Sequence, residues 1–239
     1  MEAKKIVPSR DHVAQMFDSI GKLYDVANRC ISFGIDPLFR RELVKTIPKD
    51  RPLELVDIAT GTCDQLLYCL KKRGNITKAT GIDVSKEMLK AGLKKVMKLG
   101  YSSMVDLKIE DGQNTSFADL SFDVATLSFG IRNFKDPLKG LQEIHRILKK
   151  EGSLHILEFS TPLNRLFKGF FLFYIRHILP KIGAWITSNL HAYQYLHQTI
   201  ETFAQRESFV EILGKAGFVN TTYKSLFFGI VTIYTGRKP

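Results

Sequence analysis

Three aspartates, Asp57, Asp83 and Asp111, stand at or near the ends of three successive apolar runs. At the carboxyl end of a second strand, Asp83 can accept both hydroxyls of an adenosine ribose. Asp111 could accept from an adenine amino group while the backbone N–H of Gly112 donates to the ring. Each acid alone is more simply explained as a helix cap or a solvated loop charge. Together they predict a site for an unphosphorylated nucleoside that carries positive charge and an amino group, a description that S-adenosylmethionine meets.

The turn DIATGTCD, residues 57–64, follows the first of these runs and is typical of a strand–turn–helix ligand site. Gly61 lets ligand atoms approach the backbone, and the following helix supplies free N–H groups. The stretch lacks the pattern G-x-G-x-x-G of a dinucleotide site, which argues against a pyrophosphate here. The carboxylate of Asp57 argues the same way, because it would repel phosphate and attract a cationic ligand.

Alternating sequence patterns indicate the elements that must position the turn and the acids. Runs rich in Val and Ile alternate with amphipathic, Lys-rich stretches, which is typical of strand–helix units around a parallel sheet. We expect strands at residues 53–59, 79–84, 105–109, 122–129 and 154–159. Ser85 is the expected N-cap of a helix over 85–100, and Asp136 that of a helix that starts with Pro137 and ends just before Gly152. Two final strand-like runs, TTYKSLFF and GIVTIYTGRK, are expected to pair antiparallel and to bring the total to seven strands.

The composition favours one main domain. A chain of 239 residues with 44% hydrophobic content can bury a substantial core, so we expect a single domain over 1–239, with a helical cover at 1–50 and a helical lid or insert at 161–205. The three cysteines form no C-x-x-C pair, so a reducing cytosol fits best and no metal is expected. No stretch has the features of a signal peptide or of a spanning helix, so we expect a soluble or peripheral protein.

The net charge of +11 suggests a polyanionic partner, either nucleic acid or an anionic membrane surface. Its distribution favours the membrane, because residues 159–200 contain no Asp or Glu, while cations there stand among aromatic residues. These cations are Arg165, Lys168, Arg176 and Lys181. A buried helical insert with a few solvated cations is the alternative interpretation. No N/D-P-P-Y/F string follows the fourth expected strand, so no nucleic-acid partner is expected.

Several longer strings resemble a known family. The chain is similar to the ubiquinone/menaquinone C-methyltransferases, which methylate a ring carbon of a polyprenyl benzoquinol or naphthoquinol. The similar strings are YDVANRCISFGIDPLFRREL, DIATGTCD, GIDVSKEML, SFDVATLSFGIRNFKDP, LEFSTP and LFFGIVTIYTGRK. The resemblance runs from about residue 11 to residue 238, and FGIRN beside LEFS is its most specific part.

The resemblance implies a fold and a donor site. The fold is the α/β, Rossmann-like fold of class I S-adenosylmethionine-dependent methyltransferases: a mainly parallel seven-stranded sheet with an antiparallel last strand, N-terminal helices and a helical insert after strand five. The implied donor site includes Thr62, Asp83, Asp111, Gly112 and Ser128. Asp57 and Gly61 of the turn complete the expected cofactor-binding residues.

Three strings depart from the family's usual pattern. Cys63 replaces the second glycine of G-T-G-D, and if the residue there needs a positive φ, its side chain costs about 1 to 2 kcal/mol. KKEGS stands where K-P-G-G is usual, and GQNTSF stands where the family more often has an alanine followed by L-P-F. We expect the turn to tolerate the small thiol of Cys63.

The string FGIRN supplies the expected catalytic residues Arg132 and Asn133, to which we add Tyr24. A quinol carbon becomes nucleophilic when a neighbouring hydroxyl loses its proton, and a guanidinium fixed beside that oxygen lowers its pKa and stabilises the oxyanion. A structural arginine that bonds loop carbonyls is the alternative for Arg132. Candidates for the proton acceptor are Tyr24, Glu158, His191 and His197, or a bound water.

These residues predict an enzyme that methylates a polyprenyl quinol, either demethylmenaquinol or the benzoquinol precursor of ubiquinol. A methyltransferase for another lipophilic acceptor and a non-catalytic scaffold of quinone biosynthesis at the membrane are the alternatives. We expect a cytoplasmic protein that lies peripherally on the inner face of the membrane, with the quinol and an anionic membrane surface as partners. A homodimer is compatible with this interpretation.

Overall fold

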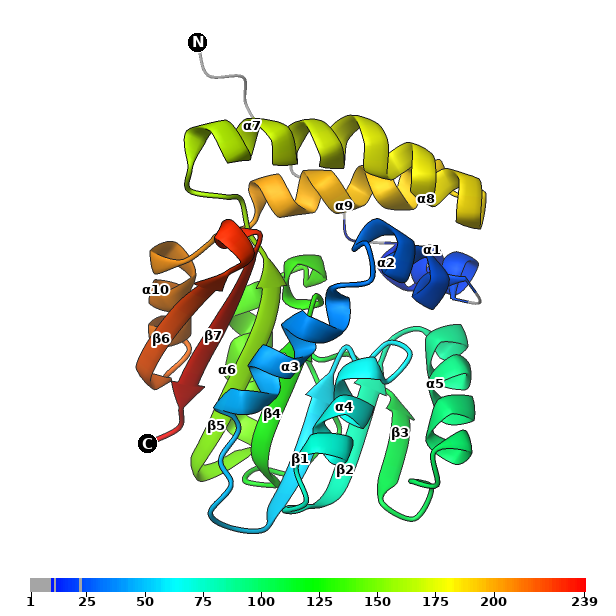
Figure 1. Ribbon diagram of the computed structural model, residues 1–239. Helices are drawn as coiled ribbons and strands as arrows, with labels where there is room; N and C mark the ends of the chain where they lie inside the picture. Colours follow the sequence, from blue (N-terminus) through cyan, green and yellow to red (C-terminus); the bar gives the residue numbers. More distant parts are fainter. Residues whose placement is uncertain (1–9, 11, 22) are drawn as a thin grey trace.

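The computed structural model describes residues 10, 12–21 and 23–239, and a seven-stranded sheet forms its centre (Figure 1). The strand order is β3-β2-β1-β4-β5-β7-β6. The strands are β1 Leu53–Ile58, β2 Ile76–Asp83, β3 Val105–Ile109, β4 Phe122–Ser128, β5 Leu148–Phe159, β6 Val219–Leu226 and β7 Val231–Arg237. The first five run parallel, and β7 is antiparallel to both of its neighbours. The expected sheet, mainly parallel with an antiparallel last strand, is confirmed.

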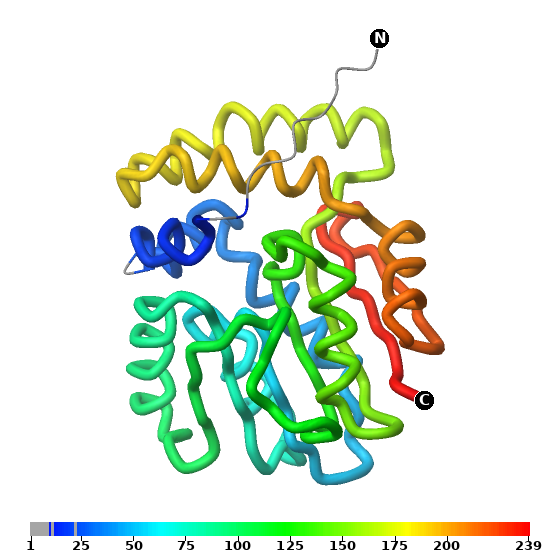
Figure 2. The backbone as a smooth tube through the Cα atoms, turned by 180° about the vertical axis from the view of Figure 1, so that it is seen from behind, coloured from blue at the N-terminus to red at the C-terminus, as the bar shows by residue number. Residues whose placement is uncertain are grey.

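Helices cover both faces of the sheet, because its central strands are apolar on both sides. The covering helices are α3 Asp36–Thr46, α4 Asp64–Lys72, α5 Lys86–Lys98, α6 Pro137–Ile147 and α10 Glu207–Lys215. On one face, Leu141 of α6 and Phe209 of α10 pack in a core with β4 and β5. On the other face, Leu43 of α3 and Leu66 of α4 pack against β1. Figures 1 and 2 show helices on both faces of the sheet.

Two helices begin at the expected caps. The Ser85 hydroxyl accepts the N–H of Met88 at 3.2 Å, and the Asp136 carboxylate accepts the N–H of Lys139 at 3.1 Å. Each bond satisfies one of the donors that the first helical turn leaves unpaired. The cap at Ser85 also fixes the chain directly after Asp83, where the expected ribose contact lies.

The expected end of the second of these helices just before Gly152 is wrong. α6 ends at Ile147, and β5 begins at Leu148, which pairs with Phe122 of β4. The register of β5 against β4 shifts after Leu148, Glu151 has a φ of 62°, and a Cβ at Gly152 would come within 2.7 Å of the Lys149 carbonyl oxygen. Strand pairing and this local backbone geometry therefore override the amphipathic, Lys-rich pattern that predicted a longer helix.

Two helical segments lie over the carboxyl ends of the strands. The N-terminal cover consists of α1 Val13–Ile20 and α2 Tyr24–Ile31, and the lid consists of α7 Arg165–Phe173, a π-helical stretch η2 Tyr174–Ile178, α8 Leu179–Thr187 and α9 Leu190–Thr202. Cover and lid share one apolar cluster, and the Tyr174 hydroxyl donates to the Ile31 carbonyl at 2.8 Å. Both Figures 1 and 2 show the lid helices as a separate layer above the sheet. Of the expected cover at 1–50, residues 1–9, 11 and 22 lie outside the described residues.

Candidate active site

A cavity of about 300 Å³ opens at the carboxyl ends of β1 to β4. We call it the polar cavity because its walls carry more polar groups than those of the second cavity described below. Its walls include the expected donor residues Gly61, Asp83, Asp111, Gly112 and Ser128. These residues follow four different strands, and the parallel sheet brings the ends of those strands together at one edge. The structure therefore gathers five of the seven expected cofactor-binding residues around one space.

Asp83 is the most firmly held of these residues. Its Oδ2 accepts the Gly61 N–H at 2.8 Å, and its Oδ1 accepts the Ser85 N–H at 2.9 Å. Burial raises the pKa of Asp83, while these two backbone bonds oppose that shift. Each carboxylate oxygen keeps one further lone pair, so the group can still accept two hydrogen bonds from a ligand.

Asp111 and Gly112 form the opposite side of the polar cavity. The Asp111 carboxylate is exposed, and its Oδ1 accepts the Gln113 N–H at 2.9 Å. A Cβ at Gly112 would come within 2.6 Å of an Ile58 methyl carbon and 2.8 Å of the Phe134 ring. Only glycine fits there, which leaves the backbone as the wall of the cavity.

Asp57 and Thr62 are the two expected donor contacts that the structure does not bring to the polar cavity. Asp57 is buried beneath the turn, where it accepts from the hydroxyls of Thr60 and Thr126, both at 2.6 Å. The Thr62 hydroxyl donates to Asp25 of α2 at 2.6 Å. Asp57 thus supports the turn from below, and Thr62 ties the turn to the cover.

Replacing Asp57 with asparagine is expected to stabilise the fold at high pH only. Burial raises the pKa of Asp57 to about 6, so its favourable contribution is present below pH 4 and is lost as pH rises through 6. Asp57→Asn should therefore raise the free energy of unfolding by about 1 to 3 kcal/mol at pH 8 and by much less at pH 4. Urea titrations at both pH values measure this difference, and an equal change at the two pH values would contradict it.

Cys63 adopts the left-handed conformation that the turn demands, with φ of 66°. Its side chain is fully buried, and burial raises its thiol pKa to about 12, so it stays neutral. The space for its sulfur comes from Gly92 of α5, since a Cβ at position 92 would overlap that sulfur. The turn accommodates the thiol through a glycine on the neighbouring helix.

This pairing predicts a strong coupling between positions 63 and 92. Gly92→Ala alone should destabilise the protein by about 1 to 3 kcal/mol, because the new methyl group overpacks against Cys63. Cys63→Gly removes the obstacle, so Gly92→Ala should cost less than half as much in that background. Thermal unfolding of the two single variants and the double variant gives a double-mutant cycle. Additive losses of stability would show that the two sites are independent.

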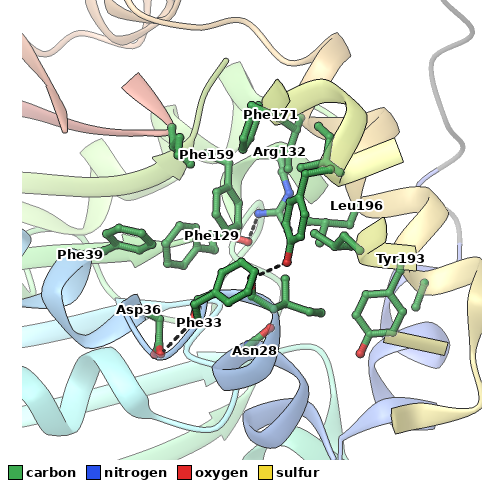
Figure 3. Close-up of a pocket in the computed structure, with 18 of the residues that line it drawn as sticks. Asn28, Phe33, Asp36, Phe39, Phe129, Arg132, Phe159, Phe171, Tyr193 and Leu196 are labelled. Atoms are coloured by element: carbon green, nitrogen blue, oxygen red, sulfur yellow. Dashed lines mark hydrogen bonds between the residues drawn. The ribbon is translucent and has the colours of Figure 1, made fainter. Parts of the chain in front are cut away.

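A second cavity, of about 340 Å³, lies between the cover, the lid and the ends of β4 and β5. Its walls are mainly apolar and rich in aromatic side chains, which include Phe33, Phe39, Phe129, Phe159, Phe171 and Tyr193 (Figure 3). The rings of Phe129 and Phe159 lie tilted against each other at 31°, with centroids 4.4 Å apart. We call this space the aromatic cavity.

Three side chains, Phe17, Tyr24 and Phe129, line both cavities. Phe17 and Tyr24 meet edge to face with ring centroids 6.0 Å apart. Burial raises the pKa of Tyr24, which keeps its hydroxyl protonated at neutral pH. The expected catalytic residue Tyr24 therefore stands at the junction of the two cavities as a hydrogen-bond donor.

Arg132 lies on the wall of the aromatic cavity and is only 5% exposed. Its guanidinium donates to Glu158 at 2.8 Å and also to the Phe129 carbonyl oxygen, the bond drawn in Figure 3. Burial raises the pKa of Glu158, and the charge of Arg132 opposes that rise. Arg132 thus bonds a loop carbonyl, as a structural arginine would. It also lies beside the aromatic cavity, where it can contact a ligand.

The other expected acceptor residues are dispersed. Asn133 lines the polar cavity instead of the aromatic one. Glu158 is fully buried behind Arg132. His191 is exposed, and neither His191 nor His197 lines either cavity. Of the proton-acceptor candidates, only Tyr24 lies where the two cavities meet.

Three residues that the sequence interpretation missed belong to the cavities. Arg10 lines the polar cavity and donates to the Arg132 carbonyl at 3.0 Å. Arg40 of α3 and Tyr195 of α9 line the aromatic cavity, where the Arg40 guanidinium lies 5.7 Å from the centre of the Phe129 ring. No local motif marks Arg10 or Tyr195, because each reaches its place only through the packing of the segments before α1 and in the lid. Arg40 lies within the family string over residues 24–43, but only the packing of α3 shows that it faces the aromatic cavity.

Solved structures share this architecture. A methyltransferase from Thermotoga maritima matches with a TM-score of 0.67 at 19% identity, covering 95% of this chain and 100% of that one. Phosphoethanolamine N-methyltransferase 2 of Haemonchus contortus, solved with S-adenosyl-L-methionine, matches with a TM-score of 0.68 at 18% identity, covering 98% of this chain and 60% of that one. The fold, with its polar cavity at the switch point of the sheet, is that of class I S-adenosylmethionine-dependent methyltransferases.

Sequence comparison places the chain within that class. The ubiE/COQ5 methyltransferase family matches residues 5–238, and the chain belongs to this family. It is 39% identical over 234 residues to the ubiquinone/menaquinone biosynthesis C-methyltransferase UbiE of Geotalea daltonii, covering 98% of this chain and 99% of the relative. It is also 39% identical over 229 residues to the demethylmenaquinone methyltransferase of Bacteroides fragilis, covering 95% and 93%. The family resemblance found in the sequence is confirmed.

Proposed function

We propose that this protein transfers the methyl group of S-adenosylmethionine to a ring carbon of a polyprenyl quinol. The observation that carries the proposal is the meeting of a polar cavity and an aromatic cavity at Phe17, Tyr24 and Phe129. Such a junction allows a donor and a flat acceptor to face each other across a short gap. The names of the relatives from Geotalea daltonii and Bacteroides fragilis support quinone precursors as the acceptor class.

The residues of the polar cavity fit the adenosyl donor. Asp83 retains lone pairs for two ribose hydroxyls, and Asp111 with Gly112 offers an acceptor and a donor to the adenine edge. When bound, S-adenosylmethionine supplies a methyl group activated by a sulfonium. The rings of Phe17 and Tyr24 at the junction would stabilise that positive charge through their faces.

The aromatic cavity would hold and activate the acceptor. A quinol hydroxyl has a pKa near 10 and is mostly protonated at pH 7. Arg132, beside the aromatic cavity, would stabilise the ionised oxygen, and the surrounding aromatic rings exclude water. Asp57 and Thr62 contribute by holding the turn and the cover in place, and Asn133 contributes to the donor side.

The test is an assay of methyl transfer with labelled S-adenosylmethionine. Demethylmenaquinol and a benzoquinol precursor of ubiquinol are supplied separately, and the extracted quinols are analysed for label. The proposal predicts label on the ring carbon of at least one of them. Label on neither quinol, with S-adenosylmethionine bound normally in calorimetry, would refute the proposed acceptor class while leaving the donor site intact.

We further propose that the lid rests on an anionic membrane surface, from which the quinol enters. Within the described residues, no helix is both long and apolar enough to cross a bilayer. The lid nevertheless presents exposed apolar side chains, namely Leu166, Phe170, Phe173, Ile178 and Trp185, the last of which is 85% exposed. Exposed cations at Arg165, Lys168 and Lys181 lie among them, whereas Arg176 is bonded to Glu201 at 2.7 Å. This combination suits the boundary between lipid headgroups and acyl chains.

Reversing the charge of Arg165, Lys168 and Lys181, for which the described part of the chain shows no ion pair, should release the protein from vesicles. Wild-type protein is expected to sediment with vesicles that contain phosphatidylglycerol, because each cation near an anionic surface contributes about 1 kcal/mol. The variant Arg165→Glu/Lys168→Glu/Lys181→Glu should bind at least about tenfold more weakly. The control is Lys71→Glu/Lys94→Glu/Lys98→Glu, which has the same net charge but places its exposed changes on α4 and α5. Equal loss of binding in both variants would contradict a specific role of the lid.

A further inference from the structure

Tyr195 of α9 is a buried hydroxyl on the wall of the aromatic cavity. The residue is 6% exposed, and within the described part of the chain its hydroxyl has no hydrogen-bond partner. An unpaired buried hydroxyl is costly, so native proteins seldom keep one without a reason. Tyr174, from the same lid, differs in that its hydroxyl donates to the Ile31 carbonyl. The hydroxyl of Tyr195 is therefore available to a ligand.

The Tyr195 hydroxyl and Arg132 lie on elements that pack against each other, and the charge of Arg132 acts on the phenol. α9 packs against η1 Ile131–Asn133, the short 3₁₀ turn that carries Arg132. Burial raises the pKa of Tyr195, while the positive charges of Arg132 and Arg10 oppose that rise and the charge of Glu158 adds to it. The phenol therefore stays protonated at neutral pH and can only donate to an anionic oxygen in the aromatic cavity.

We propose that Tyr195 and Arg132 together form an oxyanion site, which binds the ionised hydroxyl oxygen of the acceptor ring. This inference rests on the proposed function, since it assigns a second donor to the acceptor oxygen of that reaction. Tyr195 keeps its own proton and donates a hydrogen bond, so no proton changes hands at this residue. Arg132 alone would stabilise the ionised oxygen less strongly, because the buried carboxylate of Glu158 already balances part of its charge.

The position of Tyr195 on the lid gives the oxyanion site a further property. Arg132 follows β4 at the edge of the sheet, whereas Tyr195 belongs to a helix of the lid. In this structure α9 packs against η1, and both Tyr195 and Arg132 line the aromatic cavity. Ionisation of the acceptor is thereby coupled to a closed, water-poor cavity, in which hydrogen bonds to an anion are strongest.

The ionisation of 1-naphthol in the aromatic cavity tests this inference without methyl transfer. Naphthol is a flat phenol whose absorbance changes when it ionises, so its pKa can be read while it is bound. Wild-type protein should lower that pKa relative to water, and Tyr195→Phe should reverse the shift by about one to two pKa units, the effect of one hydrogen bond to a charged oxygen. Tyr223→Phe is the matched control, because its hydroxyl bonds Glu207 on the far β6 and α10 side of the sheet.

The rate of methyl transfer gives a second measurement. In Tyr195→Phe the rise of kcat with pH should move to higher pH by a similar amount, while donor affinity and thermal stability stay near those of wild type. Naphthol that fails to bind wild-type protein, or that ionises equally in wild type and Tyr195→Phe, overturns the oxyanion site. A Tyr195-dependent shift in a protein that methylates no quinol would uphold the site and refute the proposed function.

Discussion

Asp83→Ala is expected to weaken the binding of S-adenosylhomocysteine by at least about 100-fold. Hydrogen bonds to a charged acceptor are each worth about 1.5 to 3 kcal/mol, and the proposed ribose contact makes two of them. The substitution also leaves the N–H groups of Gly61 and Ser85 without their acceptor, so the turn loses its anchor. Isothermal titration calorimetry measures the affinity directly, and methyl transfer at saturating quinol should fall with it.

The control for Asp83 is Asp106→Ala. Asp106 is an exposed acid on β3 that pairs only loosely with Lys108 at 3.6 Å, so its removal should change donor affinity less than twofold. Circular dichroism of both variants checks that the sheet is intact. If Asp83→Ala bound S-adenosylhomocysteine as tightly as wild type, the nucleoside could not rest on Asp83.

Arg132→Ala is expected to lower the rate of methyl transfer by about 100- to 1,000-fold, the usual effect of removing one donor to a developing oxyanion. The same change leaves the carboxylate of Glu158 buried without its cation, which should destabilise the fold by about 3 to 5 kcal/mol. The two effects must be separated, because a partly unfolded enzyme is also inactive. Initial rates and urea denaturation are therefore measured on the same preparation.

A double variant separates the effect on the rate of methyl transfer from the effect on stability. Arg132→Met/Glu158→Leu replaces the buried pair by apolar side chains, which is expected to restore most of the lost stability. The rate should stay as low as in Arg132→Ala, because no guanidinium then faces the acceptor oxygen. A double variant with both wild-type stability and wild-type rate would show that Arg132 is a structural residue only.

Local sequence patterns predicted most of the sheet. β3 begins and ends at the expected residues, and the ends of β1, β2 and β4 lie within one residue of the expected positions. The start of β2 was not predicted because Thr77 and Lys78 are polar and exposed, so residues 76–78 lack the apolar pattern of a buried strand. The start of β5 was not predicted because LKKEG, residues 148–152, carries a helical pattern. The pairing of Leu148 with Phe122 of β4 and the backbone hydrogen bonds of Glu151 and Gly152 with Lys238 make it a strand.

The donor site was more predictable than the acceptor site. Asp83, Asp111 and Gly112 follow strand ends, and the ends of parallel strands necessarily meet at one edge of the sheet. Asp57 was also expected at this edge of the sheet. It lies within β1, and its carboxylate accepts hydrogen bonds from the hydroxyls of Thr60 and Thr126 instead of facing the polar cavity. Arg10 and Tyr195 could not be found this way, since they belong to the cover and the lid, whose placement depends on long-range packing.

The tolerance of Cys63 in the turn depends on a residue of another helix. A positive φ at Cys63 entered the sequence interpretation only as a condition, taken from the glycine that usually stands there, and the structure gives a φ of 66°. The compensating residue, Gly92, lies on α5 and carries no local signal of its role. Only the packing of α5 against the turn reveals why a side chain is tolerated at position 63.

A structure of the protein with S-adenosylhomocysteine and a short-chain menaquinol bound together tests the central claim most directly. The two-cavity account predicts the ribose on Asp83, the quinol ring between the aromatic side chains of the second cavity, and the sulfur and the ring carbon facing each other at Tyr24. A nucleoside bound away from Asp83, or a quinol ring bound outside the aromatic cavity, would contradict it.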